Sequence, residues 1–450
     1  MNGFVRRTYR HHVGLLFDQK SWLWTYRERA EVMKQTEVLF LEAVKASLKN
    51  EHVLWQKPLA LDEWQRIFYL AESHHVLPMV YEAVFQCDAV QQSGQKELRE
   101  LFQIYRRKTL NLVMLQTIKT QEYLDLLRFL QQKGIRVLTV KGIVCRELYP
   151  KPDHRLSGDE DILVEASQFR KCHKALLEFG MKPVKKGIDL DEEYEVSYGK
   201  QGSPLYIELH KELFSSDSEV YGDFNRFFEN PVKNQILIEK EGIEISTLNY
   251  TEHLFYLLCH AYKHFLHCGF GIRQVCDIVM YGNTWGERIN GQLLLGWSRE
   301  IHGEFFAAAL FQIGRKYLVF DEKKACFPEE WRKIKVDESM LLRDILDSGV
   351  YGYESRERMH SSNLTLNEVG RQWHKKRGFT VLRTIFPPVK SMKREFSFLK
   401  TAPFLLPIAW ILRILKYGKE VCGYKCKGVA GTLETGNRRI RLMKKYKIIK

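Results

Sequence analysis

The chain has 450 residues, of which 45% are hydrophobic, so it has enough apolar material for two or three folded domains and is not a disordered protein. Its formal net charge of +15 is unevenly distributed, because residues 375–450 hold 20 Lys and Arg against 3 acids, whereas the other 374 residues hold 50 against 52. The composition therefore excludes a uniformly basic protein and places the basic character in the C-terminal segment.

The N-terminal part of the chain is predicted to be helical after a short extension. Residues 1–32 lack clear periodicity and are expected to be a disordered or non-native extension, with Met33 as the physiological start. From Met33 onward, Val38, Leu41, Val44 and Leu48 follow helical spacing. Further helical patterns continue to residue 133, so residues 33–133 are predicted to form a helical region.

The hydrophobic pattern changes at residue 134. The β-branched stretch 135–140 predicts a strand, and a helix is expected to begin at Gly142. A strand at 161–165 and a helix at 167–179 follow, and then come two extended stretches at 194–199 and 205–210 and a hairpin at 235–247. Residues 134–248 are thus predicted to form a small mixed α/β domain.

The rest of the chain is predicted to be helical, which makes the whole protein an α+β fold with a small mixed β-sheet between two helical regions. Residues 249–374 are assigned to a helical domain and 375–450 to a basic segment with an amphipathic helix. The apolar stripe of this helix, formed by Ile408, Ile411, Leu412 and Leu415, is expected to pack on the preceding domain. The last fifteen residues fit either a solvated basic end or a contact with nucleic acid or an anionic membrane.

Three acidic residues stand at the start of an apolar strand, in the sequence RLSGDEDILV. Alternation along a strand places Asp159 and Asp161 on one face and Glu160 on the other. In LYIELH, Glu208 becomes a third carboxylate of the same site if the two strands are neighbours. Two carboxylates about 4 Å apart repel by roughly 4 kcal/mol at an effective dielectric near 20. Mg²⁺, or Mn²⁺, bound by Asp159, Asp161 and Glu208 would offset this repulsion.

Basic and glycine residues near these acids are candidates for binding a nucleotide. Gly142 lies where a strand turns into a helix, so its backbone can approach a phosphate closely. Lys141 and Arg155 can contact phosphate oxygens. His210 shares the face of Glu208 and is a further candidate for binding the nucleotide, where it either orients that carboxylate or contacts a phosphate; the alternative is that it closes the strand at the surface.

The stretch VKGIVCRELYPKPDHRLSGDEDILV, followed about 45 residues later by IELH, resembles the nucleotidyltransferase superfamily, and within it an uncharacterised nucleotidyltransferase-like family. The resemblance covers roughly residues 57–280 well and extends loosely to about 417. It implies that Asp159 and Asp161 bind metal, that Glu208 helps to activate the acceptor hydroxyl, and that Gly142 lies at the phosphates. It also implies contacts to nucleotide or acceptor from a set in the second domain: His260, Lys263, His264, Arg273 and Asp277.

Each of these interpretations has a simpler alternative. An acidic pair at a strand end is often a solvated loop, and the five residues of the second domain are equally consistent with helix packing. His260 and His264 have the i, i+4 spacing of a zinc site, but the glutamate that a zinc protease requires is missing.

The sequence as a whole predicts a Mg²⁺-dependent nucleotidyltransferase that moves a nucleoside monophosphate from an NTP to an unidentified acceptor hydroxyl and releases pyrophosphate. The alternative is a binding protein with this fold and little activity, whose basic tail binds nucleic acid or an anionic membrane. Ile143, where relatives often have Ser, and Glu160, where they have an apolar residue, favour that alternative. A γ-phosphoryl-transferring kinase is a third hypothesis.

Nine dispersed cysteines indicate reduced thiols and a cytoplasmic protein, with peripheral membrane association as a further expectation.

Overall fold

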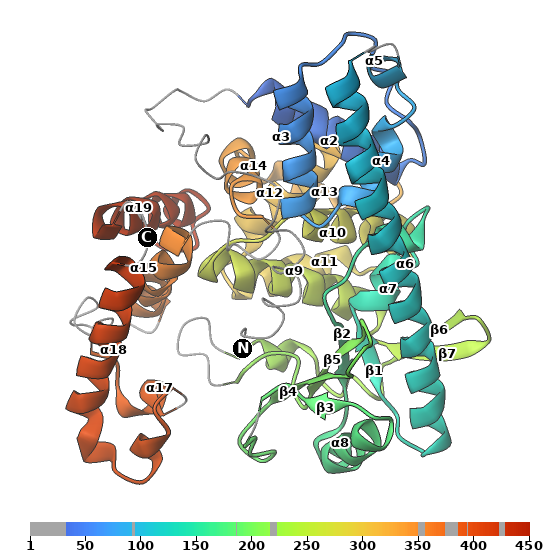
Figure 1. Ribbon diagram of the computed structural model, residues 1–450. Helices are drawn as coiled ribbons and strands as arrows, with labels where there is room; N and C mark the ends of the chain where they lie inside the picture. The colour runs from blue at the N-terminus through green and yellow to red at the C-terminus, as the bar shows by residue number, and fades with distance from the viewer. Residues whose placement is uncertain are drawn as a thin grey trace.

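The computed structural model describes residues 33–91, 95–185, 187–216, 223–349, 356–373, 386–393, 395–422 and 428–450. The expectation for residues 1–32 lies outside this part of the chain. Figure 1 shows a helical N-terminal region, a β-sheet below it, a second helical region and a group of C-terminal helices to one side. The α+β fold class predicted from the sequence is confirmed. The domain boundaries drawn from the sequence remain predictions.

The N-terminal helices include one that is much longer than the others. They are α2 (Gln35–Leu48), α3 (Leu61–Ser73), α4 (Leu77–Val84), α5 (Asp88–Gln91) and α6 (Lys96–Gln132). The first part of α6 packs in the large helical core through Leu101 and Phe102, and its last turns pack against the sheet through Leu126 and Leu130. The long helix therefore connects the two cores of the molecule.

A five-stranded mixed sheet has the order β1-β2-β5-β4-β3, and a separate hairpin consists of β6 and β7. The strands are β1 (Leu138–Val140), β2 (Glu160–Leu163), β3 (Lys182–Pro183), β4 (Glu195–Gly199), β5 (Tyr206–His210), β6 (Ile236–Lys240) and β7 (Ile243–Thr247). Two short helices lie between the first strands: α7 (Gly142–Arg146) after β1 and α8 (Phe169–Glu178) after β2. β2 pairs with β5 in parallel and with β1 in the antiparallel direction.

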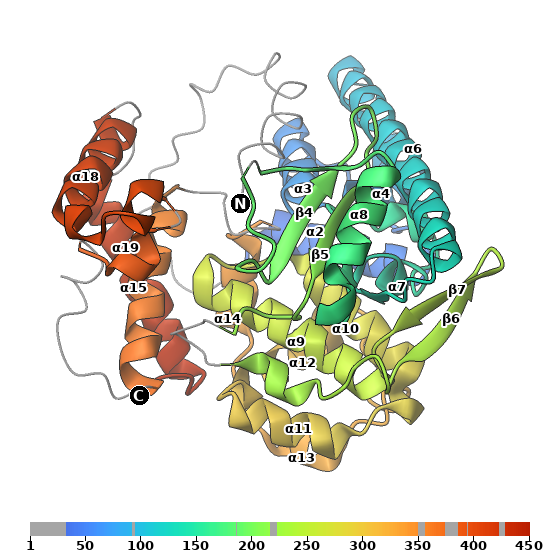
Figure 2. The same ribbon diagram turned by 90° about the horizontal axis from the view of Figure 1, so that it is seen from below.

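The two faces of the sheet have different neighbours, as Figure 2 shows. One face packs against α6 and α8 through side chains such as Ile162, Ile207 and Leu209, which form a compact apolar core. Because side chains alternate along a strand, the polar residues Asp161, Glu208 and His210 are directed away from that core. They lie toward the helical region that follows the sheet, where Lys141 contacts His260 of α9.

The second helical region is built from α9 (Tyr250–His267), α10 (Ile272–Trp285), α11 (Gly291–Glu300), α12 (Glu304–Tyr317), α13 (Glu329–Lys333) and α14 (Ser339–Leu346). The C-terminal helices are α15 (Arg356–Trp373), α17 (Val389–Met392), α18 (Leu406–Cys422) and α19 (Gly428–Lys445). Buried Arg439 of α19 donates hydrogen bonds to the carbonyls of Phe265 and His267, which are among the last carbonyls of α9 and have no partner within that helix. The C-terminal helices thus support the end of α9.

One expectation for the basic segment needs correction. The apolar stripe of α18 was expected to pack on the preceding domain, but Ile408, Ile411, Leu412 and Leu415 are exposed. In the last fifteen residues, which the sequence analysis left open, Tyr446 and Ile449 are buried in the helical core while Arg441 and Lys444 are exposed, so binding by the basic side chains stays a prediction. Within the described residues, no helix is long and apolar enough to cross a membrane.

Candidate active site

Strand register brings the predicted acids together. In the parallel pairing of β2 with β5, Asp161 lies directly beside Glu208, so the two strands are neighbours as the sequence analysis required. Ile162 and Leu209, which follow them, point to the opposite face and are fully buried. The burial of the apolar set fixes this register, because a slip by one residue would move the apolar side chains out of the core.

Asp161, Glu208 and His210 form a group whose donor atoms all lie within 4.8 Å of one another, the spacing of a metal site. His210 Nε2 lies 3.4 Å from Asp161 Oδ1 and 3.9 Å from Glu208 Oε2. Its Nδ1 lies 3.9 Å from Glu195 Oε2 on β4. The His210 ring is buried, and neither nitrogen has a hydrogen-bond partner within the described residues. His210 therefore does not close the strand at the surface but lies inside the acidic group.

The negative charge of this group is only partly balanced. Burial raises the pKa of Glu208 well above its ordinary value, and the charges of Asp159, Glu195 and Asp161 raise it further. Burial also raises the pKa of Asp159, and Asp161 adds to the effect. Asp159 itself is outside the group of three donor atoms. Buried carboxylates that lie close together favour either protonation of one of them or binding of a cation. The arrangement therefore fits a divalent metal held by Asp161 and Glu208, with His210 beside them.

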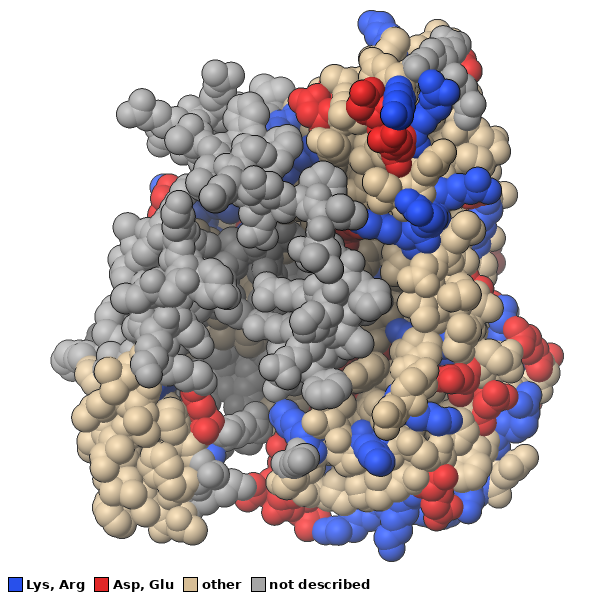
Figure 3. Space-filling model, viewed as in Figure 1, with Lys and Arg blue, Asp and Glu red and all other residues tan. Residues whose placement is uncertain are grey.

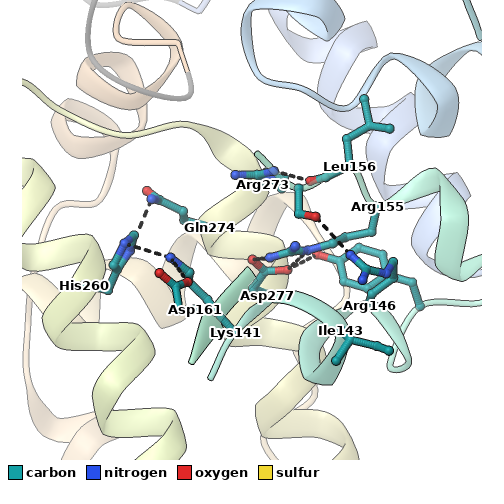
Figure 4. Close-up of polar contacts among 12 residues, drawn as sticks. Lys141, Ile143, Arg146, Arg155, Leu156, Asp161, His260, Arg273, Gln274 and Asp277 are labelled. Atoms are coloured by element: carbon teal, nitrogen blue, oxygen red, sulfur yellow. Dashed lines mark hydrogen bonds and ion pairs between the residues drawn. The ribbon is translucent and has the colours of Figure 1, made fainter. Parts of the chain in front are cut away.

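Lys141 is the cation nearest to Asp161. Its Nζ lies 2.7 Å from Asp161 Oδ2 and 3.3 Å from His260 Nε2. Figure 4 shows the Lys141 side chain beside Asp161 and His260. Burial would raise the pKa of Asp161, but Lys141 and His210 overcome this effect and lower it. Lys141 also has a positive φ of 63°, which is unusual for a residue with a side chain, and its amide donates to His253 Nε2 at 3.1 Å. The backbone of Lys141 is thus strained, and the residue is held by His253 at its amide and by Asp161 at its side chain. Strain of this kind is typical of functional sites.

Glu160, the odd acid of the motif, faces away from this group and has a structural role. It is fully buried and accepts hydrogen bonds from the Ile143 amide at 2.8 Å, the Arg146 guanidinium at 2.8 Å and the Ser157 hydroxyl at 3.1 Å. A Cβ on Gly142 would lie 1.9 Å from Glu160 Oε2. The first amide after Gly142 thus binds a carboxylate of the protein itself, and Gly142 gives that carboxylate room.

Arg155 and Asp277 were both expected to contact the nucleotide or the acceptor, but they pair with each other. Arg155 donates to both oxygens of Asp277, at 3.0 and 2.6 Å, and both side chains are buried. Tyr149 donates to the same carboxylate at 2.7 Å. Figure 4 shows this pair between the loop before β2 and helix α10. Its position indicates that it joins the loop that carries the acids to the second helical region.

Of the other residues expected from the second domain, His260 lies beside Lys141, and His264 lies beside His260. His260 and His264 have their Nε2 atoms 3.3 Å apart, and burial lowers the pKa of both well below the ordinary value. No third metal-ligating side chain completes a zinc site with them among the residues that the structure describes. Arg273 reaches back from α10 and donates to the Leu156 carbonyl. Lys263 is on α9, near enough to lower the pKa of both histidines.

Helix α6 contributes residues that the sequence analysis missed. Buried Lys119 donates to the carbonyls of Ser157 and Gly158 at 2.6 and 3.1 Å, and the Ser157 amide donates to Gln116 at 2.9 Å. Burial lowers the pKa of Lys119 to about 8, although Glu160 and Asp159 oppose the shift. These contacts hold the loop immediately before Asp159. The only signal in the sequence was a lysine and a glutamine on the buried side of a long helix.

A mixed sheet that presents acids from neighbouring parallel strands next to a helical region is the arrangement expected of a nucleotidyltransferase-like protein. A family model described as an uncharacterised nucleotidyltransferase matches residues 61–311, which is more than half of the chain. The chain therefore belongs to this family. Neither the search of curated proteins nor that of solved structures gives a match.

Proposed function

We propose that the protein is a divalent-metal-dependent nucleotidyltransferase that uses an NTP and an acceptor hydroxyl. The observation that carries the proposal is the position of Asp161 beside Glu208 on parallel strands, with buried His210 completing a group of donor atoms within 4.8 Å. The family match supports nucleotidyl transfer in general. Carboxylate oxygens are the ligands that Mg²⁺ and Mn²⁺ prefer, and imidazole nitrogen is compatible with Mn²⁺.

In the proposed reaction, the acceptor oxygen forms a bond to the α-phosphorus while the bond from that phosphorus to the bridging oxygen of the β-phosphate breaks. The products are the acceptor carrying a nucleoside monophosphate, and pyrophosphate. A bound divalent cation would neutralise phosphate charge and stabilise the charge that develops in the transition state. Asp161 and Glu208 would hold it, with Asp159 as the further acid at the edge of the site.

Each of the remaining residues has a role that its surroundings support. Glu208 is the proposed acceptor of the hydroxyl proton, since its raised pKa suits a base better than that of an ordinary carboxylate. Lys141, Arg273 and Lys263 are the proposed phosphate contacts, with His260 and His264 near them. We do not assign phosphate contacts to Gly142 and Arg155, because Glu160 accepts from the amide after Gly142 and both carboxylate oxygens of Asp277 accept from Arg155.

The reaction is tested by incubating the protein and a cell extract with each NTP, labelled on either the α- or the γ-phosphate, in the presence of Mg²⁺ or Mn²⁺. A nucleotidyltransferase passes the α-label to an acceptor and releases the γ-label as pyrophosphate. Transfer of the γ-label to an acceptor would identify a kinase instead. If neither label is transferred and calorimetry detects no NTP binding, the binding-protein alternative is favoured.

Replacement of Glu208 is expected to make the metal-free protein more stable and to abolish its activity. In metal-free protein at pH 7, Glu208→Gln is expected to raise the free energy of unfolding by roughly 1 to 2 kcal/mol, because a neutral amide avoids the cost of either protonating a carboxyl group or keeping it ionised among like charges. It is expected to abolish both activity and stabilisation by Mn²⁺. The measurement is denaturant unfolding with and without metal.

The pH dependence of this difference follows from the raised pKa of Glu208. Below the ordinary pKa of 4.5, Glu208 is protonated in both the folded and the unfolded protein, so it does not lower the free energy of unfolding. As the pH rises from there toward the raised pKa of the folded protein, the unfolded protein ionises first and the free energy of unfolding of the wild type falls. The advantage of Glu208→Gln should therefore vanish near pH 4 and grow toward neutral pH. The matched control is Glu165→Gln, an exposed glutamate just after β2. If Glu208→Gln is no more stable than the wild type at pH 7, the neighbouring carboxylates do not destabilise Glu208, and the interpretation of this group is wrong.

A further inference from the structure

Helix α18 and the turn before it carry an exposed apolar face. Phe404 is 79% exposed and Ile411 58%, and Ile408, Leu412 and Leu415 are also exposed. These five residues, which we name the α18 apolar face, follow helical spacing along one side. In Figure 3 the lobe formed by this segment, at the lower left, is mostly tan and carries few charges.

The opposite side of α18 already has its own packing partners. Ala409 is buried with Met392 and Leu399 in a small apolar cluster, and the Trp410 indole donates to the Pro387 carbonyl at 2.8 Å. The exposed side is therefore not required to hold α18 on α17. A contiguous apolar face of large side chains on a protein surface commonly marks an interaction site.

The charge of the surrounding sequence restricts what can cover this face. Residues 386–427 hold 9 Lys and Arg against 2 acids, a net charge of +7. A second copy of the chain would bring the same positive segment to the contact. Residues 1–32 hold 6 Lys and Arg against 3 acids, so they are positive as well. The charge favours an anionic partner over either of these.

We propose that the α18 apolar face binds an anionic phospholipid surface, with α18 lying in the plane of the interface. An aliphatic helix face within a positively charged segment is the composition of interfacial helices, because apolar side chains enter the acyl boundary and basic ones meet lipid phosphates. Double-stranded nucleic acid presents mainly phosphates, sugars and polar base edges, so it would bury less of a contiguous aliphatic face such as Ile408, Ile411 and Leu412 than an acyl boundary would. The helix lies on the membrane rather than across it.

The proposal is tested by sedimentation of the full-length protein with vesicles of phosphatidylcholine alone and of phosphatidylcholine mixed with phosphatidylglycerol. The protein should bind the mixed vesicles, bind less as salt rises, and bind phosphatidylcholine alone much more weakly. The variant Ile411→Glu/Leu415→Glu should lose about tenfold or more in partitioning. Because both side chains are already exposed, the variant should keep the thermal unfolding midpoint of the wild type.

A matched control separates this face from apolar exposure in general. Leu110→Glu/Met114→Glu makes the same charge change at the same spacing on α6, where Leu110 and Met114 are 59% and 53% exposed. It should bind vesicles like the wild type. Equal loss in both variants would overturn the proposal, as would a wild-type protein that ignores anionic vesicles.

Three further results would assign the face to another occupant and overturn the proposal. The first is a dimer, detected by light scattering, that Ile411→Glu/Leu415→Glu converts to a monomer. The second is hydrogen-exchange protection of residues 404–415 without lipid that is lost when residues 1–32 are removed. The third is binding to single- or double-stranded nucleic acid that the same variant abolishes while vesicle binding persists.

Discussion

Asp161→Asn is expected to lower the rate of nucleotidyl transfer by about a thousandfold or more, the scale on which phosphoryl-type transfer depends on metal positioning and charge neutralisation. Asp161 lies beside Glu208 in register and 3.4 Å from the His210 ring, so it is central to the proposed metal group. Asparagine keeps the shape of the side chain but lacks the negative charge that holds the cation. The measurement is transfer of α-label at saturating NTP and metal.

The same substitution leaves the Lys141 ammonium without its carboxylate partner, so the fold of the variant must be verified by circular dichroism and thermal unfolding. If Asp161→Asn does not fold, Glu208→Gln provides the test, because it is expected to be at least as stable as the wild type. Asp191→Asn, an exposed position outside the site, is the matched control and should keep full activity. A folded Asp161→Asn protein with normal transfer would refute the assignment of the site.

Asp161 and Glu208, at the centre of the site, could be predicted from the sequence because the alternation of apolar and polar residues along each strand determines which way their side chains point. Alternation in LYIELH placed Leu209 in the core and Glu208 on the other face, and the apolar run after Asp161 identified a buried strand. Once two such strands are neighbours, burial of their apolar faces leaves few possible registers. The family resemblance and the family match then agree on the same segment.

The surroundings of the site depend on contacts between distant parts of the chain, which local pattern does not report. Arg155 lies shortly before the acids in the sequence, but its partner Asp277 lies 122 residues away. Lys119 comes from α6, in a region that the sequence analysis separated from the α/β domain. Whether a basic side chain near an acidic motif binds a ligand or another residue of the protein depends on such tertiary contacts.

The exposed face of α18 was mispredicted for a related reason. An apolar stripe indicates that a helix face is buried against something, but it does not identify the partner. The small cluster with α17 uses the side of α18 that carries Ala409, so the larger apolar side is left at the surface. Pattern alone could not distinguish these two sides.

Glu160→Ala is expected to lower the free energy of unfolding by about 3 to 5 kcal/mol, because it removes one partner of a buried ion pair and leaves the Arg146 charge uncompensated. Both side chains are 0% exposed. The substitution also removes the acceptor for the Ile143 amide. Denaturant unfolding measures the change. The matched control is Glu178→Ala, which breaks an exposed ion pair with Lys133 and should cost less than about 1 kcal/mol.

A double-mutant cycle with Gly142→Ala tests whether Glu160 is the reason that glycine is required there. In the wild-type background the new Cβ would lie 1.9 Å from Glu160 Oε2, so the carboxylate must move away from its partners. In the Glu160→Ala background the three contacts of the Cβ with this carboxylate are removed, while the strain of a φ of +27° remains. The losses of unfolding free energy in the two single variants, Gly142→Ala and Glu160→Ala, should therefore sum to more than the loss in the double variant, by about 1 kcal/mol or more. Strict additivity would mean that Gly142 is required for its backbone conformation alone, and that Glu160 does not restrict the residue at this turn.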